Sequence, residues 1–341
     1  MLPAGALQPV TDAHLEITPE FTPASGQWNW IGYWIDENLE NQATNINEVG
    51  FEGLDATSAN GGLRVTQPST PQWAFTGAAS GQTFWRFRDS TLTTPGLGAN
   101  PSNMSNNAMT ISLHSVQGPA GGFFSMYFSN SSPVAYFRTD DGIDATDSFS
   151  KPLNHTHYNW AFTKKGLWIV NLTAQGILNT TGQPTPVSPP QPFVFAIGDF
   201  ARWKAASFNM AELQNPQISG DPADPDSDGF SNLMEYALGG DCRVPSARRT
   251  QDALPMAPEL LRPAYDGAPW RFCYFRRIAG QQEPLDITYQ VESSPSPAAP
   301  SWSPETGTEE ILASDTEWQR VAIPVSGGTS RFFRLKAVTV Q

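Results

Sequence analysis

Cysteine, histidine and charge are scarce in this chain of 341 residues. Its two cysteines, Cys242 and Cys273, allow one disulfide in an oxidising compartment, or they remain as buried thiols. No run of about eighteen apolar residues occurs, so the sequence predicts no membrane-spanning helix. Long patterns of helical period are also missing, which argues against a protein built mainly from helices.

A basic and apolar leader is missing as well. The first residues, Met1 to Ala6, fit an expression start placed after a signal peptide that has been removed. We therefore expect a secreted or cell-surface protein, periplasmic or extracellular. The C-terminal residues show no obvious anchor.

Basic residues are outnumbered, and the formal net charge is -13, which makes nucleic acid an improbable partner. An acidic surface instead suits calcium, solubility and cationic ligands. What is abundant is proline (30), glycine (28), tryptophan (11) and phenylalanine (20). With many Asn, Ser and Thr residues, this mixture is typical of a secreted all-β protein rich in turns.

Short runs of alternating polarity, bounded by turn residues, predict the fold. Examples are Met109–Val116, Gly122–Phe128 and Leu167–Ala174. Their density favours a jelly-roll-like β-sandwich over residues 11–205. A calcium-loop linker with a short helix is expected over 211–240, and a second small β-sandwich domain over 242–341.

The segment from Asp224 to Glu235 has the residue spacing of a calcium loop. Such a loop takes oxygen ligands at positions one, three, five, seven, nine and twelve, with glycine at six. The sequence fills them with Asp224, Asp226, Asp228, the Phe230 carbonyl, Asn232 and Glu235, and Gly229 stands at six. The alternative is an acidic linker rich in proline and glycine that holds no ion.

Two of the four histidines, His155 and His157, stand two residues apart. On an extended strand such residues project from the same face, and neutral imidazole is a common ligand of transition metals. We expect copper or zinc here, with copper favoured, and His14 or His114 as a third ligand. Trp160 and Trp28 are candidates for aromatic neighbours of the site. The alternative is a solvated or hydrogen-bonded histidine pair with ordinary core tryptophans.

The region around these histidines resembles a bacterial family of surface-anchored protein repeats, also described as choice-of-anchor M. The resemblance spans roughly residues 11–205 and is strongest in a His-x-His-x-Asn-Trp-x-Phe-Thr run. The matching residues are His155, His157, Asn159, Trp160, Phe162, Thr163 and Gly166. Residues 13–17, 83–87 and 95–98 resemble other family segments, with Glu16 in place of an aspartate. The resemblance implies a secreted or wall-anchored protein linked with metal uptake.

The remainder of the chain resembles the C-terminal modules of secreted planctomycete and verrucomicrobial proteins. In these modules a dockerin-like or thrombospondin-type calcium loop precedes a small β module. A more distant similarity is to secreted copper-binding proteins of methanotrophs. The implied bacterial origin rests on these resemblances.

Other functions stay open from the sequence. A carbohydrate-binding or adhesive module would use tryptophan faces for sugars, and the partners would then be cell-surface glycans. A structural filament or surface-layer subunit would suit β modules with a calcium-stiffened joint. An enzyme is less favoured, because no Gly-x-Ser-x-Gly or His-Glu-x-x-His motif occurs. Metal ions, and metal-uptake proteins by family resemblance, are the partners we expect.

Overall fold

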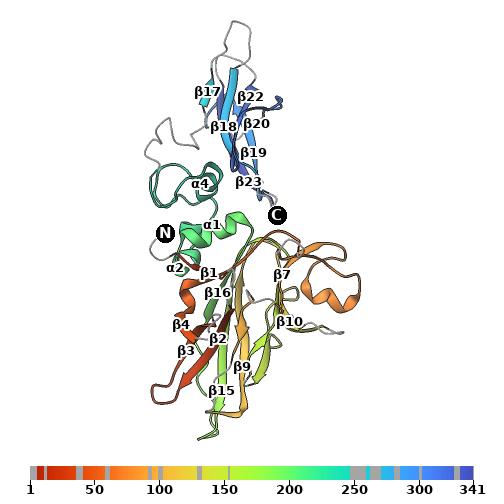
Figure 1. The fold of residues 1–341 in the computed structure, drawn as a ribbon, viewed down its shortest axis with the longest axis vertical. Helices are drawn as coiled ribbons and strands as arrows, with labels where there is room; N and C mark the ends of the chain where they lie inside the picture. Colours follow the sequence, from red (N-terminus) through yellow and green to blue (C-terminus); the bar gives the residue numbers. More distant parts are fainter. Residues whose placement is uncertain are drawn as a thin grey trace. The chain divides into compact units, whose positions relative to one another are not determined.

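The computed structural model divides the chain into two compact units, Met1–Gln214 and Asn215–Gln341. It describes residues 6–10, 14–35, 41–57, 62–90, 94–98, 103–128, 133–152, 154–245, 259–261, 270–279, 285–298, 302–325 and 331–340. Within these residues no helix has both the length and the apolar character needed to cross a membrane. Strands dominate both units (Figure 1). The prediction of an all-β fold is confirmed.

The described residues of the N-terminal unit form three sheets. The first has six strands in the order β1-β5-β16-β15-β9-β12. Their bounds are Gln8–Val10 for β1, Val49–Gly53 for β5, Gln191–Ile197 for β16, Gly166–Leu178 for β15, Met104–Gln117 for β9 and Ser148–Pro152 for β12. The predicted strands around 109–116 and 167–174 are the middles of β9 and β15, which pair antiparallel.

The other two sheets have five strands each, in the orders β11-β10-β14-β7-β6 and β13-β8-β2-β3-β4. The bounds in the former are Val134–Arg138, Phe124–Phe128, Asn159–Phe162, Thr83–Phe87 and Arg64–Thr66. In the latter they are Thr156–His157, Gly96–Leu97, His14–Thr22, Gln27–Ile35 and Asn41–Asn45. This second five-stranded sheet carries the histidines.

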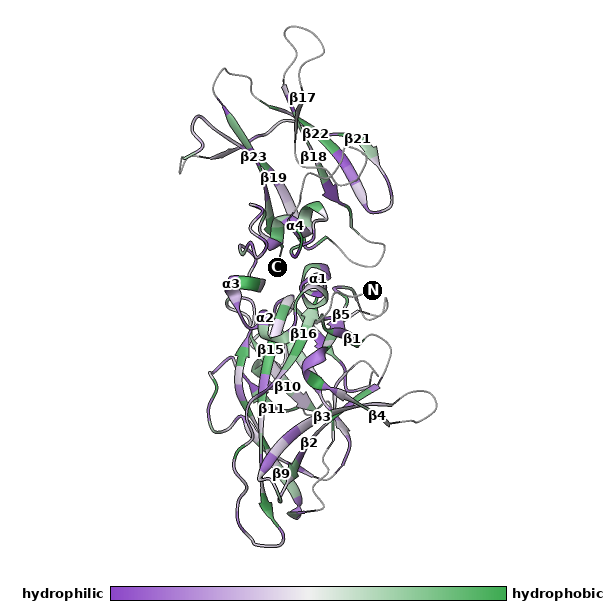
Figure 2. Ribbon diagram, turned by 90° about the vertical axis from the view of Figure 1, so that its left-hand side faces the viewer, coloured by the Kyte–Doolittle hydropathy of each residue, from purple (hydrophilic) through white to green (hydrophobic). Residues whose placement is uncertain are grey.

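One aromatic core holds these three sheets together. Trp160 of β14 lies 5.1 Å from Phe195 of β16, measured between ring centroids, and Trp30 of β3 lies 5.7 Å from Phe193. Trp160 and Phe195 are fully buried. Figure 2 shows the hydrophobic residues running along β16 and β15. Because all three sheets contribute apolar faces to this cluster, the unit is a β-sandwich, and a smaller cluster around Phe84 and Tyr127 lies beside it.

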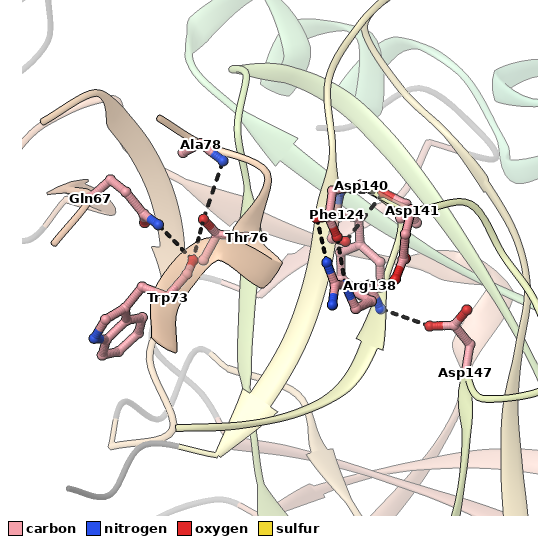
Figure 3. A network of polar contacts seen from close by, with 10 residues as sticks. Gln67, Trp73, Thr76, Ala78, Phe124, Arg138, Asp140, Asp141 and Asp147 are labelled. Atoms are coloured by element: carbon pink, nitrogen blue, oxygen red, sulfur yellow. Dashed lines mark hydrogen bonds and ion pairs between the residues drawn. The ribbon is translucent and has the colours of Figure 1, made fainter. Parts of the chain in front are cut away.

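Polar contacts fix two loops on the outer side of the sheet that contains β10 (Figure 3). In the 3₁₀ segment η3 (Pro71–Thr76), the Trp73 carbonyl accepts hydrogen bonds from Gln67 Nε2 at 2.6 Å and from Thr76 Oγ1 at 3.1 Å. In the acidic loop after β11, Arg138 donates to Asp140 and pairs with Asp141. Both carboxylates are therefore paired with the same guanidinium group. A second 3₁₀ segment, η1, spans Ile46–Glu48.

A buried ion cluster lies at the end of β5. Asp55 is 2% exposed and accepts hydrogen bonds from Arg64 at 2.7 Å, Trp85 Nε1 at 2.7 Å and Lys165 Nζ at 3.1 Å. Two cations and an indole therefore surround one carboxylate. Such a cluster tolerates no loss of its anion, because the cations would remain buried without compensation.

Helices α1 (Asp199–Ser207) and α2 (Met210–Leu213) complete the N-terminal unit. The first packs on β15 and β16. The boundary between the units follows at Gln214, so the expected 211–240 linker is divided: α2 belongs to the first unit, and residues 224–235 belong to the second.

Two sheets, ordered β17-β18-β22-β21 and β20-β19-β23, are formed by the described residues of the C-terminal unit. Their bounds are Glu259–Leu261, Trp270–Arg277, Trp318–Val325 and Glu310–Ser314, then Ser303–Pro304, Ile287–Ser294 and Phe332–Thr339. Helices α3 (Pro216–Ser219) and α4 (Asn232–Leu238) precede them. Phe230, Met234 and Leu238 pack into the core between these sheets, so the acidic segment 224–235 is part of this unit. Cys242 and Cys273 are both buried, each about 1% exposed.

Candidate metal centre

Sheet pairing brings three histidines to one face of the sheet β13-β8-β2-β3-β4. His14 begins β2, His157 ends β13 and His155 stands two residues before His157. The short strand β8 lies between them, with Gly96 paired to His157 on one side and to Glu16 on the other. Residues paired across strands share a face, as do residues two apart along one strand. His14, Glu16, His155 and His157 therefore project from the same face.

The three imidazole rings form a nearly equilateral triangle. The centroid distances are 4.8 Å for His14–His155, 4.6 Å for His14–His157 and 4.6 Å for His155–His157. One nitrogen from each ring lies within 4.8 Å of the other two. Three nitrogens at bonding distance from one tetrahedral ion are about 3.3 Å apart, from metal–nitrogen distances of about 2.0 Å. Small ring rotations thus suffice to place all three on one ion.

A carboxylate fixes the orientation of His155. Its Nδ1 lies 3.1 Å from Glu16 Oε2, so Nδ1 carries the proton and Nε2 is left as the donor for a metal. This hydrogen bond, with the desolvation of the carboxylate opposing it, lowers the pKa of Glu16. A carboxylate on the far nitrogen of a ligating histidine sets the tautomer and raises the basicity of the ligand.

His157 would bind a metal through Nδ1, whereas His155 would use Nε2. Its Nδ1 is buried and, within the described residues, has no hydrogen-bond partner, while the backbone of Thr94 accepts a hydrogen bond from the ring. Burial and the neighbouring His155 and His14 lower the pKa of His157 to about 4, against the opposing effects of Thr94 and Glu16. A buried nitrogen without a partner is costly unless something fills it, and a metal ion would do so.

The site favours neutral imidazoles. Desolvation, followed by the charge of His155, lowers the pKa of His14 as well, although Glu16 opposes this. At neutral pH, protons therefore compete weakly for the lone pairs of His14 and His157. Only a neutral imidazole binds a metal, so the same burial prepares both rings as ligands.

Glycine makes room for the cluster. A Cβ on Gly96 would lie 2.5 Å from His155 Cε1, and a Cβ on Gly98 would lie 2.1 Å from Glu16 Oε1. Any side chain at either position would push the imidazole or its carboxylate partner away. The glycines of the Pro-Gly-Leu-Gly segment, residues 95–98, thus leave the space that His155 and Glu16 occupy.

The other expected site residues lie elsewhere. His114 is exposed on β9, in the six-stranded sheet, and is not in the histidine group, so His14 is the third candidate ligand. Trp28 of β3 donates to the Pro186 carbonyl and packs on Phe21, with which it is paired. Phe21 lies seven residues after His14 on β2, which is roughly 23 Å along the strand. Trp160 belongs to the aromatic core. Trp28 is therefore not an aromatic neighbour of the histidines, whereas a role for Trp160 beside the site stays a prediction. The residue paired with Glu16 on β3 is Tyr33.

The acidic loop of the C-terminal unit brings three carboxylates together. Oxygens of Asp224, Asp226 and Asp228 lie within 4.8 Å of one another. Asp224 accepts from the backbone N–H of Asp228 at 3.2 Å and of Gly229 at 2.9 Å, which closes the turn. Gly229 has a φ of 94°, the left-handed conformation that position six of a calcium loop demands.

Buried oxygens of Asp226 and Asn232 in this loop lack hydrogen-bond partners among the described residues. Asp226 Oδ2 is buried, and burial with repulsion from Asp228 raises the pKa of Asp226. Asn232 is fully buried; its Nδ2 donates to the carbonyls of Ile218 and Gly220, and its Oδ1 has no partner. A cation bound among these oxygens would satisfy them and remove the repulsion.

No family model matches the sequence, and no curated protein is similar to it. The resemblance to surface-anchored repeats stays a prediction. The geometry of the two sites therefore carries the argument about function.

Residues that sequence reasoning missed are those that support the ligands. Glu16 has a readable signal, because it stands two residues after His14 and so shares its face. Gly96, Thr94 and Lys151 have none, since their roles depend on which strands pair and in what register. Burial lowers the pKa of Lys151 to about 8, with Glu16 opposing, so its ammonium stays mostly charged at pH 7.

Proposed function

We propose that this chain is a secreted bacterial surface protein that binds a transition metal through His14, His155 and His157, with copper favoured and zinc as the alternative. The observation that supports this most is the triangle of imidazoles backed by Glu16. Three neutral nitrogen donors suit both metals, and the usual affinity order places Cu²⁺ above Zn²⁺. Three protein ligands also leave room for water or another small ligand.

Metal titration tests this proposal. Protein purified without immobilised nickel is titrated with Cu²⁺ and with Zn²⁺ in competition with a chelator of known affinity. We expect one ion per chain, and loss of binding by at least about a hundredfold in the His155→Ala/His157→Ala double variant, since two of three ligands are gone. His114→Ala serves as the matched control and should bind like the wild type. Unchanged affinity in the double variant would refute the proposal.

A second proposal concerns calcium in the loop from Asp224 to Glu235. It is supported by the buried oxygens of Asp226 and Asn232, which have no hydrogen-bond partner in the described part of the chain, and by the left-handed Gly229 at the required position. Glu235, at position twelve, lies in α4, and this helix packs on β18 and β23. The Ala237 carbonyl accepts from Tyr289 at 2.7 Å, and Tyr236 donates to Asp286 at 3.0 Å. Calcium bound here would therefore stabilise the C-terminal unit.

Thermal unfolding tests the calcium proposal. Calcium at about a hundred times its dissociation constant should stabilise the folded state by roughly 2.7 kcal/mol. Asp226→Asn should remove most of this gain. Asp241→Asn is the control, because Asp241 is exposed in the same unit and its contact with the Arg243 N–H survives the change to an amide. Identical melting with calcium and with chelator would contradict the proposal.

A further inference from the structure

Lys151 is a charged residue placed where a core residue is expected. It lies on β12, two residues after Phe149, which packs against the core, so both side chains project from the core-facing side of the strand. Its exposure is 0%. A buried ammonium is strongly destabilising unless its donors are satisfied.

All three donors of this ammonium meet oxygens of one turn. Lys151 Nζ donates to the Pro152 carbonyl at 3.0 Å, to Asn154 Oδ1 at 2.8 Å and to the Asn154 carbonyl. An ammonium has three N–H bonds, so the match is complete. Asn154 Oδ1 also accepts from Thr156 Oγ1 at 3.0 Å. The turn is thereby fixed on both sides of His155.

His155 is the imidazole that most needs such a support. It is the exposed member of the three, whereas His14 and His157 are partly buried on β2 and β13. It precedes β13, so no ladder pairing of a named strand holds it. A ligand on an exposed turn contributes to affinity only if the turn holds it near the other two, because ordering a free turn upon binding costs conformational entropy.

We propose that Lys151 is a positioning residue of the metal centre, which holds the backbone at Pro152 and Asn154 so that His155 completes the three-imidazole set. This inference rests on the proposed transition-metal function. The alternative hypothesis is that the buried positive charge of Lys151 near the site repels a divalent cation and weakens its binding. The two hypotheses predict opposite signs: removing the lysine weakens metal binding if it positions His155, and strengthens binding if its charge dominates.

The test compares Lys151→Met with the matched variant Lys165→Met. Lys165 is also buried, at 8% exposure, but it serves the Asp55 ion cluster. We expect Lys151→Met to lower Cu²⁺ affinity by about ten- to a hundredfold, the usual effect of losing a support of a ligand. Pulsed electron paramagnetic resonance should then count two coordinated imidazoles instead of three. Lys165→Met should lose thermal stability but keep three imidazoles and the wild-type affinity.

Asn154→Ala is the second variant, should Lys151→Met fail to fold. Asn154 is exposed, so the fold tolerates its loss, yet the change removes an acceptor of Lys151 and of Thr156. It should weaken Cu²⁺ binding by several-fold up to about tenfold, at the lower end of such effects. Wild-type affinity with three imidazoles in Asn154→Ala and Lys151→Met, or tighter binding in either, would overturn the positioning role.

A metal-free measurement separates this inference from the proposed function. In nitrogen-15 spectra of the apoprotein, we expect the hydrogen bond to Glu16 to slow the exchange of the His155 Nδ1 proton. Lys151→Met should accelerate its exchange, and Lys165→Met should not. If the wild type binds neither Cu²⁺ nor Zn²⁺, the proposed function fails, but the exchange result still decides whether Lys151 holds the turn. Unaltered exchange in Lys151→Met would refute that role.

Discussion

Replacing Glu16 isolates the contribution of one hydrogen bond to metal binding. The carboxylate accepts from His155 Nδ1 at 3.1 Å, and its side chain is 25% exposed while that of His155 is 36% exposed. Loss of such a partner usually lowers metal affinity by about ten- to a hundredfold, which is about 1.4–2.7 kcal/mol. Because both groups are partly hydrated, we expect about tenfold for Glu16→Gln, which keeps an acceptor oxygen. Glu16→Ala, which keeps none, should approach a hundredfold.

Competition titration with a chelator measures both losses, and Glu20→Gln provides the control. Glu20 lies four residues further along β2, about 13 Å away at about 3.3 Å per residue, and accepts from the Tyr33 hydroxyl. Glu20→Gln therefore removes the same charge as Glu16→Gln without removing a hydrogen bond to an imidazole. Equal losses in Glu16→Gln and Glu20→Gln would show that only net charge matters, and the argument for an orienting hydrogen bond would be wrong.

Three further predictions concern other parts of the N-terminal unit. The metal-free protein should lose stability as the pH falls from about 6.5 towards 4, because His157 has a pKa of about 4 in the folded state and the unfolded chain binds the proton first. Urea unfolding should show that the unfolding free energy depends less on pH in His157→Asn, and an equal dependence would contradict this. Gly96→Ala should displace His155 and lower metal affinity by roughly tenfold. Gly50→Ala is the control, because its new Cβ would lie 3.4 Å from the nearest atom, and equal affinities of the two variants would refute the steric argument. Asp55→Ala should lower the free energy of unfolding by about 3–5 kcal/mol, measured by denaturant titration, because it strands Lys165 and Arg64; a loss below about 1 kcal/mol would show that the cluster is unimportant.

Much of the fold follows from local patterns. Alternating runs around Met109–Val116 and Leu167–Ala174 predict strands because one face of each must be buried, and they occupy the middles of β9 and β15. The helix expected after the calcium loop is α4. The unit boundary was less readable, because the packing of Phe230 and Met234 into the C-terminal core depends on strands far along the chain.

The sequence by itself determined the ligand chemistry: a histidine pair two residues apart on an extended segment, and an acidic loop with glycine at its sixth position. Spacing fixes these features because a strand repeats every two residues and a turn needs a left-handed residue. Only the tertiary structure decided that His14 rather than His114 joins the pair, that Gly96 leaves room beneath the rings, and that Glu16 and Lys151 hold His155. Those choices depend on strand order and register between β2, β8 and β13, which long-range packing sets and no local pattern encodes.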